Sequence, residues 1–293
     1  MATPAQWVEG ARPRTLPAAV SPVLAGTGVA VAADAFVWWK ALLALVVALA
    51  LQVAVNYAND YSDGIRGTDA NRVGPLRLVG SGTAAASQVR RAAILCFGLA
   101  GVAGLVLAAT TSWWLVAVGG VAMVAAWFYT GGATPYGYRA LGEVSVFVFF
   151  GLVAVVGTSY VQTEALTTGA WWAGAGIGAL ACAILVANNL RDIPSDTAVG
   201  KRTLAVVVGD RGSRILYGAL LLAAVVALVG VGATVTWWAL LGLVAAGLAV
   251  RALAAVWRGT TGPALVPVLR DTGLTELVYA TGLLVGCLVS AAG

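Results

Sequence analysis

Long apolar runs constrain this chain more than any other feature of its sequence. Each approaches the length of about 20 residues that an α-helix needs to cross a bilayer. The runs lie at roughly 16–33, 38–59, 90–110, 113–130, 142–161, 171–190, 214–232, 236–256 and 273–291. The chain of 293 residues is also 60% hydrophobic and only 10% charged, whereas a soluble domain carries about 25% charged residues. The pattern predicts an all-α polytopic membrane protein with nine spans, in a single domain over residues 1–293.

The basic residues predict which side of the membrane each loop faces. Of the 17 Lys and Arg residues, all except Lys40 lie on the side of the N-terminus when the runs alternate in direction. Cytoplasmic loops carry an excess of Lys and Arg. We therefore expect a bacterial cell-membrane protein with a cytoplasmic N-terminus and an external C-terminus. Tryptophan pairs open four runs on the outer side, as an interfacial aromatic belt would. They are Trp38-Trp39, Trp113-Trp114, Trp171-Trp172 and Trp237-Trp238.

Composition excludes several kinds of chemistry. The chain contains no histidine, which excludes a His-ligated zinc, a Ser-His-Asp triad and a His proton relay. The three cysteines are far apart inside apolar runs, so they are expected to be small buried hydrophobes without disulfides. The first run contains Pro17 and Pro22, which predict an irregular entry. We expect Asp210 and Asp271 to be ordinary loop acids.

Two polar clusters interrupt the apolar background, each at the end of a predicted span. The first runs from Asn56 to Asp63 and is followed by Asp69, and the second runs from Asn188 to Asp196. Carboxylates at the edge of a bilayer are costly to desolvate, so they indicate function. The clusters end two spans that are four apart in the chain. A duplicated helical unit around a central cavity would bring them face to face at its cytoplasmic end.

The spacing within the clusters favours a metal site. Residues four apart, such as Asn59 and Asp63, share one face of a helix, although Pro194 predicts that the second helix ends there. Carboxylate and amide oxygens suit a hard cation such as Mg²⁺, with Mn²⁺ as a substitute. The predicted metal ligands are Asn59, Asp60, Asp63, Asp69, Asn188, Asp192 and Asp196.

Basic residues in the adjoining loops extend this prediction to a substrate. Together with the acids they suggest Mg²⁺ bridging to a polyanion, most simply a diphosphate. A cation transporter is the alternative, but it would place ionisable groups near the bilayer midplane. Here the acids lie at one face, which favours an enzyme. Glu143 is either an N-terminal helix charge or a partner of the site residues. The bases concerned are Arg66, Arg72, Arg77, Arg139, Lys201 and Arg202.

These motifs together resemble the UbiA superfamily of intramembrane aromatic prenyltransferases. Within it, the two clusters and the stretches 12–17, 74–77, 138–143 and 200–204 are most similar to the branch that prenylates 1,4-dihydroxy-2-naphthoate. The likeness covers nearly the whole chain. One departure is that Asp69 follows Asp63 by six residues, where the superfamily pattern has four.

The resemblance implies an activity and a set of site residues. It implies Mg²⁺-dependent transfer of a polyprenyl group from polyprenyl diphosphate to 1,4-dihydroxy-2-naphthoate with loss of carbon dioxide, which gives demethylmenaquinol in menaquinone synthesis. Another aromatic acceptor, homogentisate or 4-hydroxybenzoate, would keep the same fold and metal chemistry. Partners are the two substrates and the lipid bilayer, with no nucleic acid. The catalytic residues would be Asp60, Asp63, Asp192, Asp196 and Lys201.

The resemblance also implies how the substrates are held. Trp127, Tyr129 and Tyr136 would form the aromatic wall that shelters an allylic cation. Arg14 would hold the acceptor carboxylate, or would only contribute to the excess of basic residues on the cytoplasmic side. The expected substrate-binding residues are Arg14, Asn56, Arg66, Arg72, Arg77, Tyr129, Tyr136, Arg139, Asn189 and Arg191.

Overall fold

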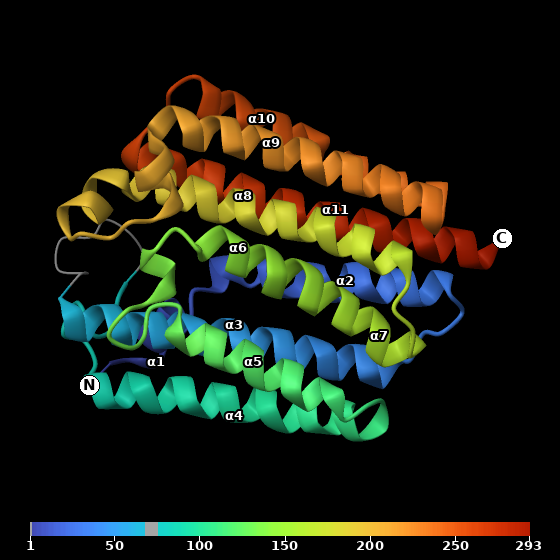
Figure 1. The fold of residues 1–293 in the computed structure, drawn as a ribbon, viewed down its shortest axis with the longest axis horizontal. Helices are drawn as coiled ribbons and strands as arrows, with labels where there is room; N and C mark the ends of the chain where they lie inside the picture. The colour runs from blue at the N-terminus through green and yellow to red at the C-terminus, as the bar shows by residue number, and fades with distance from the viewer. Residues whose placement is uncertain (1, 68–75) are drawn as a thin grey trace.

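The protein is a bundle of helices that run along one long axis (Figure 1). A computed structural model describes residues 2–67 and 76–293, so the predicted ligand Asp69 and the predicted phosphate contact Arg72 lie outside the described residues. Within that part of the chain the only β-pairing is one isolated bridge between Arg139 and Arg202. The elements are α1 (Pro4–Gly10), η1 (Pro13–Thr15), α2 (Pro17–Ala32), α3 (Trp38–Arg66), α4 (Ala86–Thr110), α5 (Trp114–Phe128), η2 (Tyr136–Tyr138), α6 (Gly142–Val146), η3 (Phe147–Val156), α7 (Gly157–Thr163), α8 (Thr168–Ala198), α9 (Leu204–Thr234), η4 (Trp237–Ala245), α10 (Ala246–Trp257), η5 (Gly262–Leu265) and α11 (Val266–Ala292).

The apolar runs became membrane-length helices. Within the described residues, seven helical segments are long and apolar enough to cross a membrane, and an eighth results if α1–η1 and α2 count as one bent span. Helix α5 is a shorter apolar helix of 15 residues. Each predicted run coincides with one of these elements. The all-α membrane class is thus confirmed, while the number of nine spans stays a prediction.

Two prolines test the expected helix boundaries, with different outcomes. The entry to the first span is irregular as predicted, because the chain bends by 49° before α2, which begins at Pro17. The prediction that the second cluster's helix ends at Pro194 is wrong, since α8 continues to Ala198. Side chains near the proline engage the backbone there. The Ser195 hydroxyl donates to the Asp192 carbonyl at 3.0 Å.

Two helices begin earlier than their apolar runs suggested, which changes the placement of two acids. Asp210 and Asp271 lie in α9 and α11 and not in loops, because these helices begin at Leu204 and Val266, although Asp210 directly follows a break in α9 at Gly209. Asp271 is only 4% exposed. Its carboxylate accepts from Arg251 at 2.8 Å and from Arg270 at 3.1 Å. Asp271 is therefore a buried helix acid paired with two exposed arginines, and the expectation of an ordinary loop acid was wrong.

Helix α8 forms the centre of the bundle. In its apolar 18-residue window 72% of residues are buried, against at most 39% in the other spans. It packs against α9, η3 and α11, while α3 packs mainly against α4. Gly151 and Gly178 allow a close approach of η3 to α8, because a Cβ built on Gly151 would lie 2.6 Å from the Gly178 Cα. Figure 1 shows α3–α5 on one side of the bundle and α8–α11 on the other.

The two ends of the bundle differ in chemistry. The loops at 129–141 and 199–203 gather at the end that holds the N-terminus, and the C-terminus lies at the opposite end (Figure 1). The four tryptophan pairs open helices at the C-terminal end, and most of their side chains are exposed. Lys40, the single base predicted there, pairs with Glu164 at 3.5 Å. The cysteines are free and at least partly buried, as expected.

Candidate active site

Helix α3 carries the first polar cluster, because the helix continues beyond the apolar run to its C-cap at Gly67. The φ of Gly67 is +75°, a left-handed conformation that glycine adopts without a Cβ penalty. Asn56 and Asp60 share one face of α3, and Asn59 and Asp63 share another, as spacing by four requires. The two faces contact different segments, so the cluster is divided between two tasks.

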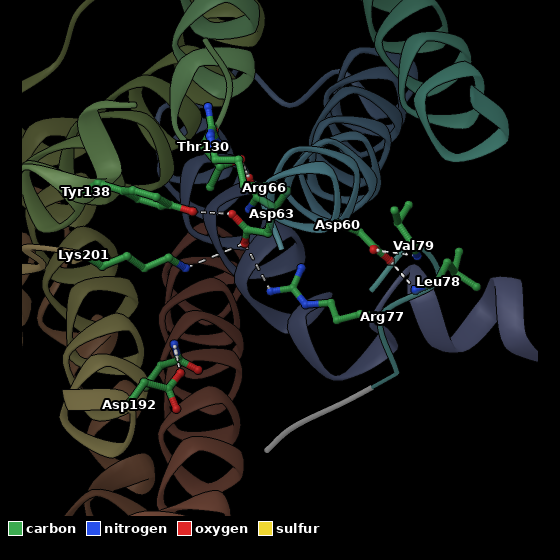
Figure 2. A network of polar contacts seen from close by, with 12 residues as sticks. Asp60, Asp63, Arg66, Arg77, Leu78, Val79, Thr130, Tyr138, Asp192 and Lys201 are labelled. Atoms are coloured by element: carbon green, nitrogen blue, oxygen red, sulfur yellow. Dashed lines mark hydrogen bonds and ion pairs between the residues drawn. The ribbon is translucent and has the colours of Figure 1, made fainter. Parts of the chain in front are cut away.

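The face with Asn56 and Asp60 fixes the backbone around it. The Asp60 carboxylate is 1% exposed and accepts from the backbone N–H groups of Leu78 at 2.7 Å and Val79 at 3.1 Å. The Asn56 amide donates to the carbonyl of Ala11 at 2.9 Å. Figure 2 shows Asp60 turned toward Leu78 and Val79 and away from Asp63. In this structure both side chains therefore hold backbone groups, and the expected roles of Asp60 as a metal ligand and of Asn56 as a substrate contact stay predictions.

The other face brings Asp63 to a cluster of polar side chains (Figure 2). Its carboxylate is buried and accepts a hydrogen bond from the Tyr138 hydroxyl at 2.6 Å. Its second oxygen lies 3.7 Å from the Arg77 guanidinium and 3.9 Å from the Lys201 ammonium. The Lys201 ammonium also lies 4.6 Å from the centre of the Tyr138 ring, within range of a cation–π interaction. Asp63 thus joins three segments that are far apart in sequence.

Asn59 and Arg66 hold the loop that supplies Tyr138. The side-chain amide oxygen of Asn59 accepts from the Thr130 hydroxyl at 2.7 Å. The Arg66 guanidinium donates to the backbone carbonyls of Thr130 and Gly132 and lies 5.8 Å from the Tyr138 ring centre. Two of its donors therefore serve the loop, which differs from the expected direct role of Arg66 on a substrate.

The second cluster is organised around one buried ion pair on α8. The Arg191 guanidinium donates to both carboxylate oxygens of Asp192, at 2.6 and 2.7 Å, and to the Asn188 carbonyl oxygen at 2.9 Å. Asp192 and Arg191 are 6% and 9% exposed. Asp196 lies one turn further along α8 and is half-buried. The expected face-sharing of Asn188 and Asp192 is present, with Arg191 joining them.

The loop that follows α8 connects the two clusters. The Lys201 backbone N–H donates to the Asp196 carbonyl at 2.9 Å, while its ammonium reaches Asp63 on α3. The Arg202 backbone N–H donates to the Tyr138 carbonyl at 3.1 Å. Residues 199–203 and the Tyr138 loop therefore run side by side and close the site at this end of the bundle.

The donors present fit Mg²⁺, although they form no closed cage. Within residues 2–67 and 76–293, no group of three or more acidic, Cys or His side chains is close enough to hold a metal ion by itself. Mg²⁺ usually binds one or two carboxylates and completes its octahedron with water and substrate phosphates. Asp63 and Asp192, with the amide oxygens of Asn59 and Asn188, offer such a set. In the structure the neighbouring bases balance the two carboxylates.

The expected aromatic wall is only partly present. Tyr129 and Tyr136 stand edge to face, with ring centres 5.5 Å apart. The Tyr136 hydroxyl donates to the Ala125 carbonyl at 2.8 Å and lies 2.9 Å from the Ser145 hydroxyl, so it is held within the protein. Trp127 instead packs against Phe97 in an apolar cluster around α4. Its place in the wall stays a prediction.

The remaining expected substrate contacts are dispersed. Arg14 and Arg139 are exposed at the loop end. Arg139 pairs through its backbone with Arg202, and both line a cavity of about 450 Å³ beside the loops. Asn189 faces the interior, where its amide donates to the Glu143 carboxylate at 3.0 Å. Glu143 also lies in the first turn of α6, so it is both an N-terminal helix charge and a partner of Asn189.

Sequence reasoning missed several residues that the structure brings into prominence. Tyr138 and Thr130 hold Asp63 and Asn59, but hydroxyl groups in a loop give no spacing signal. Glu276 is fully buried in α11, and neither carboxylate oxygen has a hydrogen-bond partner within the described chain. A lone acid inside a predicted span is itself an indicator of function or strain, and that signal was available in the sequence.

Known proteins place this architecture in a family. The sequence profile of the UbiA prenyltransferase family matches residues 19–265. The 1,4-dihydroxy-2-naphthoate octaprenyltransferase of Mycobacterium tuberculosis is 57% identical over 284 residues, covering 96% of both chains. The Escherichia coli enzyme of the same name is 37% identical and covers 94% of both.

Solved structures agree on the fold. A UbiA homologue from Aeropyrum pernix superposes with a TM-score of 0.71 at 17% identity, covering 92% of this chain and 97% of that one. A homologue from Archaeoglobus fulgidus bound to GPP and Mg²⁺ gives 0.64 at 14% identity, covering 98% and 100%. The chain belongs to the UbiA prenyltransferase family and is a membrane-embedded prenyltransferase.

Proposed function

We propose that this prenyltransferase moves a polyprenyl group from polyprenyl diphosphate to 1,4-dihydroxy-2-naphthoate, with loss of carbon dioxide, to give demethylmenaquinol. The observation that carries the proposal is the convergence of Tyr138, Arg77 and Lys201 on Asp63, beside the second cluster on α8. The names of the relatives that match almost the whole chain support the choice of acceptor.

The two acids would hold the metal. Asp63 and Asp192 each supply a carboxylate, and Asn59 and Asn188 supply neutral oxygens beside them. When bound, Mg²⁺ would neutralise the diphosphate oxygens and polarise the bond that breaks. Binding of the metal and diphosphate would draw Arg77, Lys201 and Arg191 from the acids to the phosphate oxygens, because both are anionic partners for the same bases.

The bases would then stabilise the leaving group. Lys201 and Arg77 lie within 4 Å of Asp63, so they are already placed at the metal site before substrate arrives. Preorganised cations contribute most where negative charge develops, which here is the departing diphosphate. The Tyr138 ring beneath Lys201 limits where the ammonium moves. Tyr129 would stabilise the allylic cation through the face of its ring.

The site also fits a membrane location. Sixteen of the seventeen bases, that is 17 minus Lys40, belong to one side of the predicted topology, which supports a cytoplasmic active site and N-terminus in a bacterial plasma membrane. A reporter fused after Gly293 should then be active only outside the cytoplasm. Cytoplasmic reporter activity would contradict the odd number of spans or the orientation.

A direct assay tests the function. Purified protein, polyprenyl diphosphate and Mg²⁺ are mixed with 1,4-dihydroxy-2-naphthoate labelled in its carboxyl carbon. We expect one labelled carbon dioxide per product, no release without polyprenyl diphosphate, and loss of activity with a chelator that Mg²⁺ or Mn²⁺ reverses. Prenylation of 4-hydroxybenzoate with its carboxyl retained, and no reaction of the naphthoate, would overturn the acceptor but keep the enzyme class. Cation flux into vesicles without any prenyl transfer would favour a transporter.

A further inference from the structure

One acid next to the site has an oxygen with no hydrogen-bond partner. Glu143 opens α6 and is 8% exposed. Its Oε1 accepts from the Asn189 amide at 3.0 Å, while its Oε2 has no partner within the described residues. A buried carboxyl oxygen left without a partner is costly. An ionisable group inside a helical bundle in the membrane is functional by default.

Glu143 is held firmly and lies near the site. Its backbone carbonyl accepts from the Cys182 thiol of α8 at 3.1 Å, and Asn189 fixes its carboxyl from the same helix. The preceding residue, Gly142, packs against the Tyr129 hydroxyl, which is 3.0 Å from where a Cβ on Gly142 would stand. Glu143 therefore sits at the junction of α6, α8 and the 129–141 loop.

Tyr129 and Asn189 link Glu143 to the two clusters. Tyr129 opens the loop whose Tyr138 hydroxyl donates to Asp63 at 2.6 Å. Asn189, which donates to Glu143, follows Asn188 and precedes Asp192 by one helical turn on α8. A ring bound between the diphosphate and α6 would meet Glu143 through the Oε2 atom.

We infer that Glu143 accepts the proton of the acceptor hydroxyl next to the ring carboxylate, and so acts as a catalytic base. The inference rests on the function proposed above. Asn189 would act as a positioning residue, since its hydrogen bond occupies Oε1 and leaves Oε2 without a donor from the described residues. A carboxylate within hydrogen-bond reach of a hydroxyl is the usual arrangement for a general base.

In the proposed reaction the proton that Glu143 removes from the acceptor hydroxyl is later returned to the same oxygen, so the protons balance. The O–H bond at C1 breaks and its proton goes to Oε2, which makes C2 the nucleophile. A bond forms between C2 and the allylic carbon, and the carbon–oxygen bond to diphosphate breaks with its electrons on the diphosphate. C2 now carries a carboxylate beside the C1 ketone. The C2–carboxylate bond breaks, carbon dioxide leaves, and the C1 oxygen regains the proton from Glu143.

Glu143→Gln tests this role with little change in shape. The glutamine carbonyl can still accept from Asn189, but the side chain cannot take a proton. We expect the turnover number to fall about 100-fold or more, as loss of general-base catalysis does, with little change in KM. Mg²⁺-dependent binding of a non-reactive thiolo analogue of polyprenyl diphosphate, measured without acceptor, should stay unchanged and shows that the site is folded.

A matched variant and a rescue experiment separate catalysis from structure. Glu164→Gln alters an acid at the opposite end of the bundle, where it pairs with Lys40, and should keep wild-type turnover. Glu143→Ala should regain activity with added formate, because a small carboxylate replaces the missing base. A purely structural role would not respond to formate. Turnover of Glu143→Gln within about threefold of wild type would overturn the inference.

The acceptor itself provides a test that does not depend on any variant folding. The 4-methyl ether of the naphthoate keeps the C1 hydroxyl and should be prenylated by the wild-type enzyme, whereas the 1-methyl ether should not. Prenylation of the 1-methyl ether at the parent rate would remove any role for a base at C1. Failure of the wild type on the parent naphthoate would instead overturn the proposed function, so the two failures are distinguishable.

Discussion

The two faces of α3 carry the same kinds of side chain and do different things. Asn56 and Asp60 bind backbone groups of the N-terminal segment and of residues 78–79. Asn59 and Asp63, three residues along, face the loop with Tyr138 and the base Lys201. A carboxylate whose two oxygens accept backbone N–H groups is committed to structure, whereas one beside movable bases can exchange those bases for a metal.

The second cluster shows a third use of the same residues. Asp192 is engaged by its own neighbour Arg191, so its charge is balanced within one helix. Asp63 is balanced by residues from two other segments. Binding at Asp63 would therefore release bases of two other segments, while binding at Asp192 would release a base of α8 itself. The division of α3 into two faces predicts different consequences for substitutions at Asp60 and Asp63, which are three residues apart.

The largest effect is expected at Asp63. Asp63→Asn removes the charge that would bind the metal and leaves Lys201 and Arg77 without their carboxylate, so turnover should fall by about 1,000-fold or more. The protein should remain folded, because the asparagine oxygen can still accept from Tyr138. Steady-state assays across a Mg²⁺ titration measure the change, with Asp60→Asn as the matched control. Equal losses in the two variants would contradict the division of the faces.

Lys201 should produce the next largest effect. Lys201→Met keeps the contact with the Tyr138 ring but removes the cation, so the turnover number should fall about 100-fold, the loss typical of one transition-state donor. KM should change less than the turnover number, because the negative charge on the diphosphate increases as it leaves. Single-turnover rates measure the chemical step directly. An unchanged rate with a raised KM would make Lys201 a simple binding residue.

The sequence predicted the class of fold because apolar length and composition alone decide it. It also predicted that acids and amides four apart share a face. It could not predict which face meets the site, because that depends on the helix rotation set by packing. The spacing alone therefore does not show that the Asp60 carboxylate accepts from Leu78 and Val79. Pro194 does not end α8, which continues to Ala198, and beyond it the Ser195 and Thr197 hydroxyls donate to the carbonyls of Asp192 and Ile193.

Asp60 should affect stability more than chemistry. In Asp60→Asn the amide presents one acceptor oxygen to two backbone N–H groups, so one buried donor loses its partner at a cost of about 1–3 kcal/mol. Thermal unfolding in detergent should show a lower midpoint, and turnover of the folded fraction should fall less than tenfold. A loss of Mg²⁺ binding without a loss of stability would return Asp60 to the metal site.

Asn56 should give the smallest effect and the finest test of the comparison. Asn56→Ala removes one amide donor to Ala11, which costs about 1 kcal/mol, and loosens the N-terminal segment without touching Asp63. Hydrogen exchange should increase in residues 4–15, because α1 and η1 lose the Asn56 hydrogen bonds to Ala11 and Thr15 and are held to α3 only by the remaining ones, such as those from Gln52 and Tyr57, while exchange in the 129–141 loop stays constant. KM for both substrates should remain within about twofold of wild type. If KM for one substrate rises instead while exchange is unchanged, Asn56 contacts that substrate, and both faces of α3 belong to the active site.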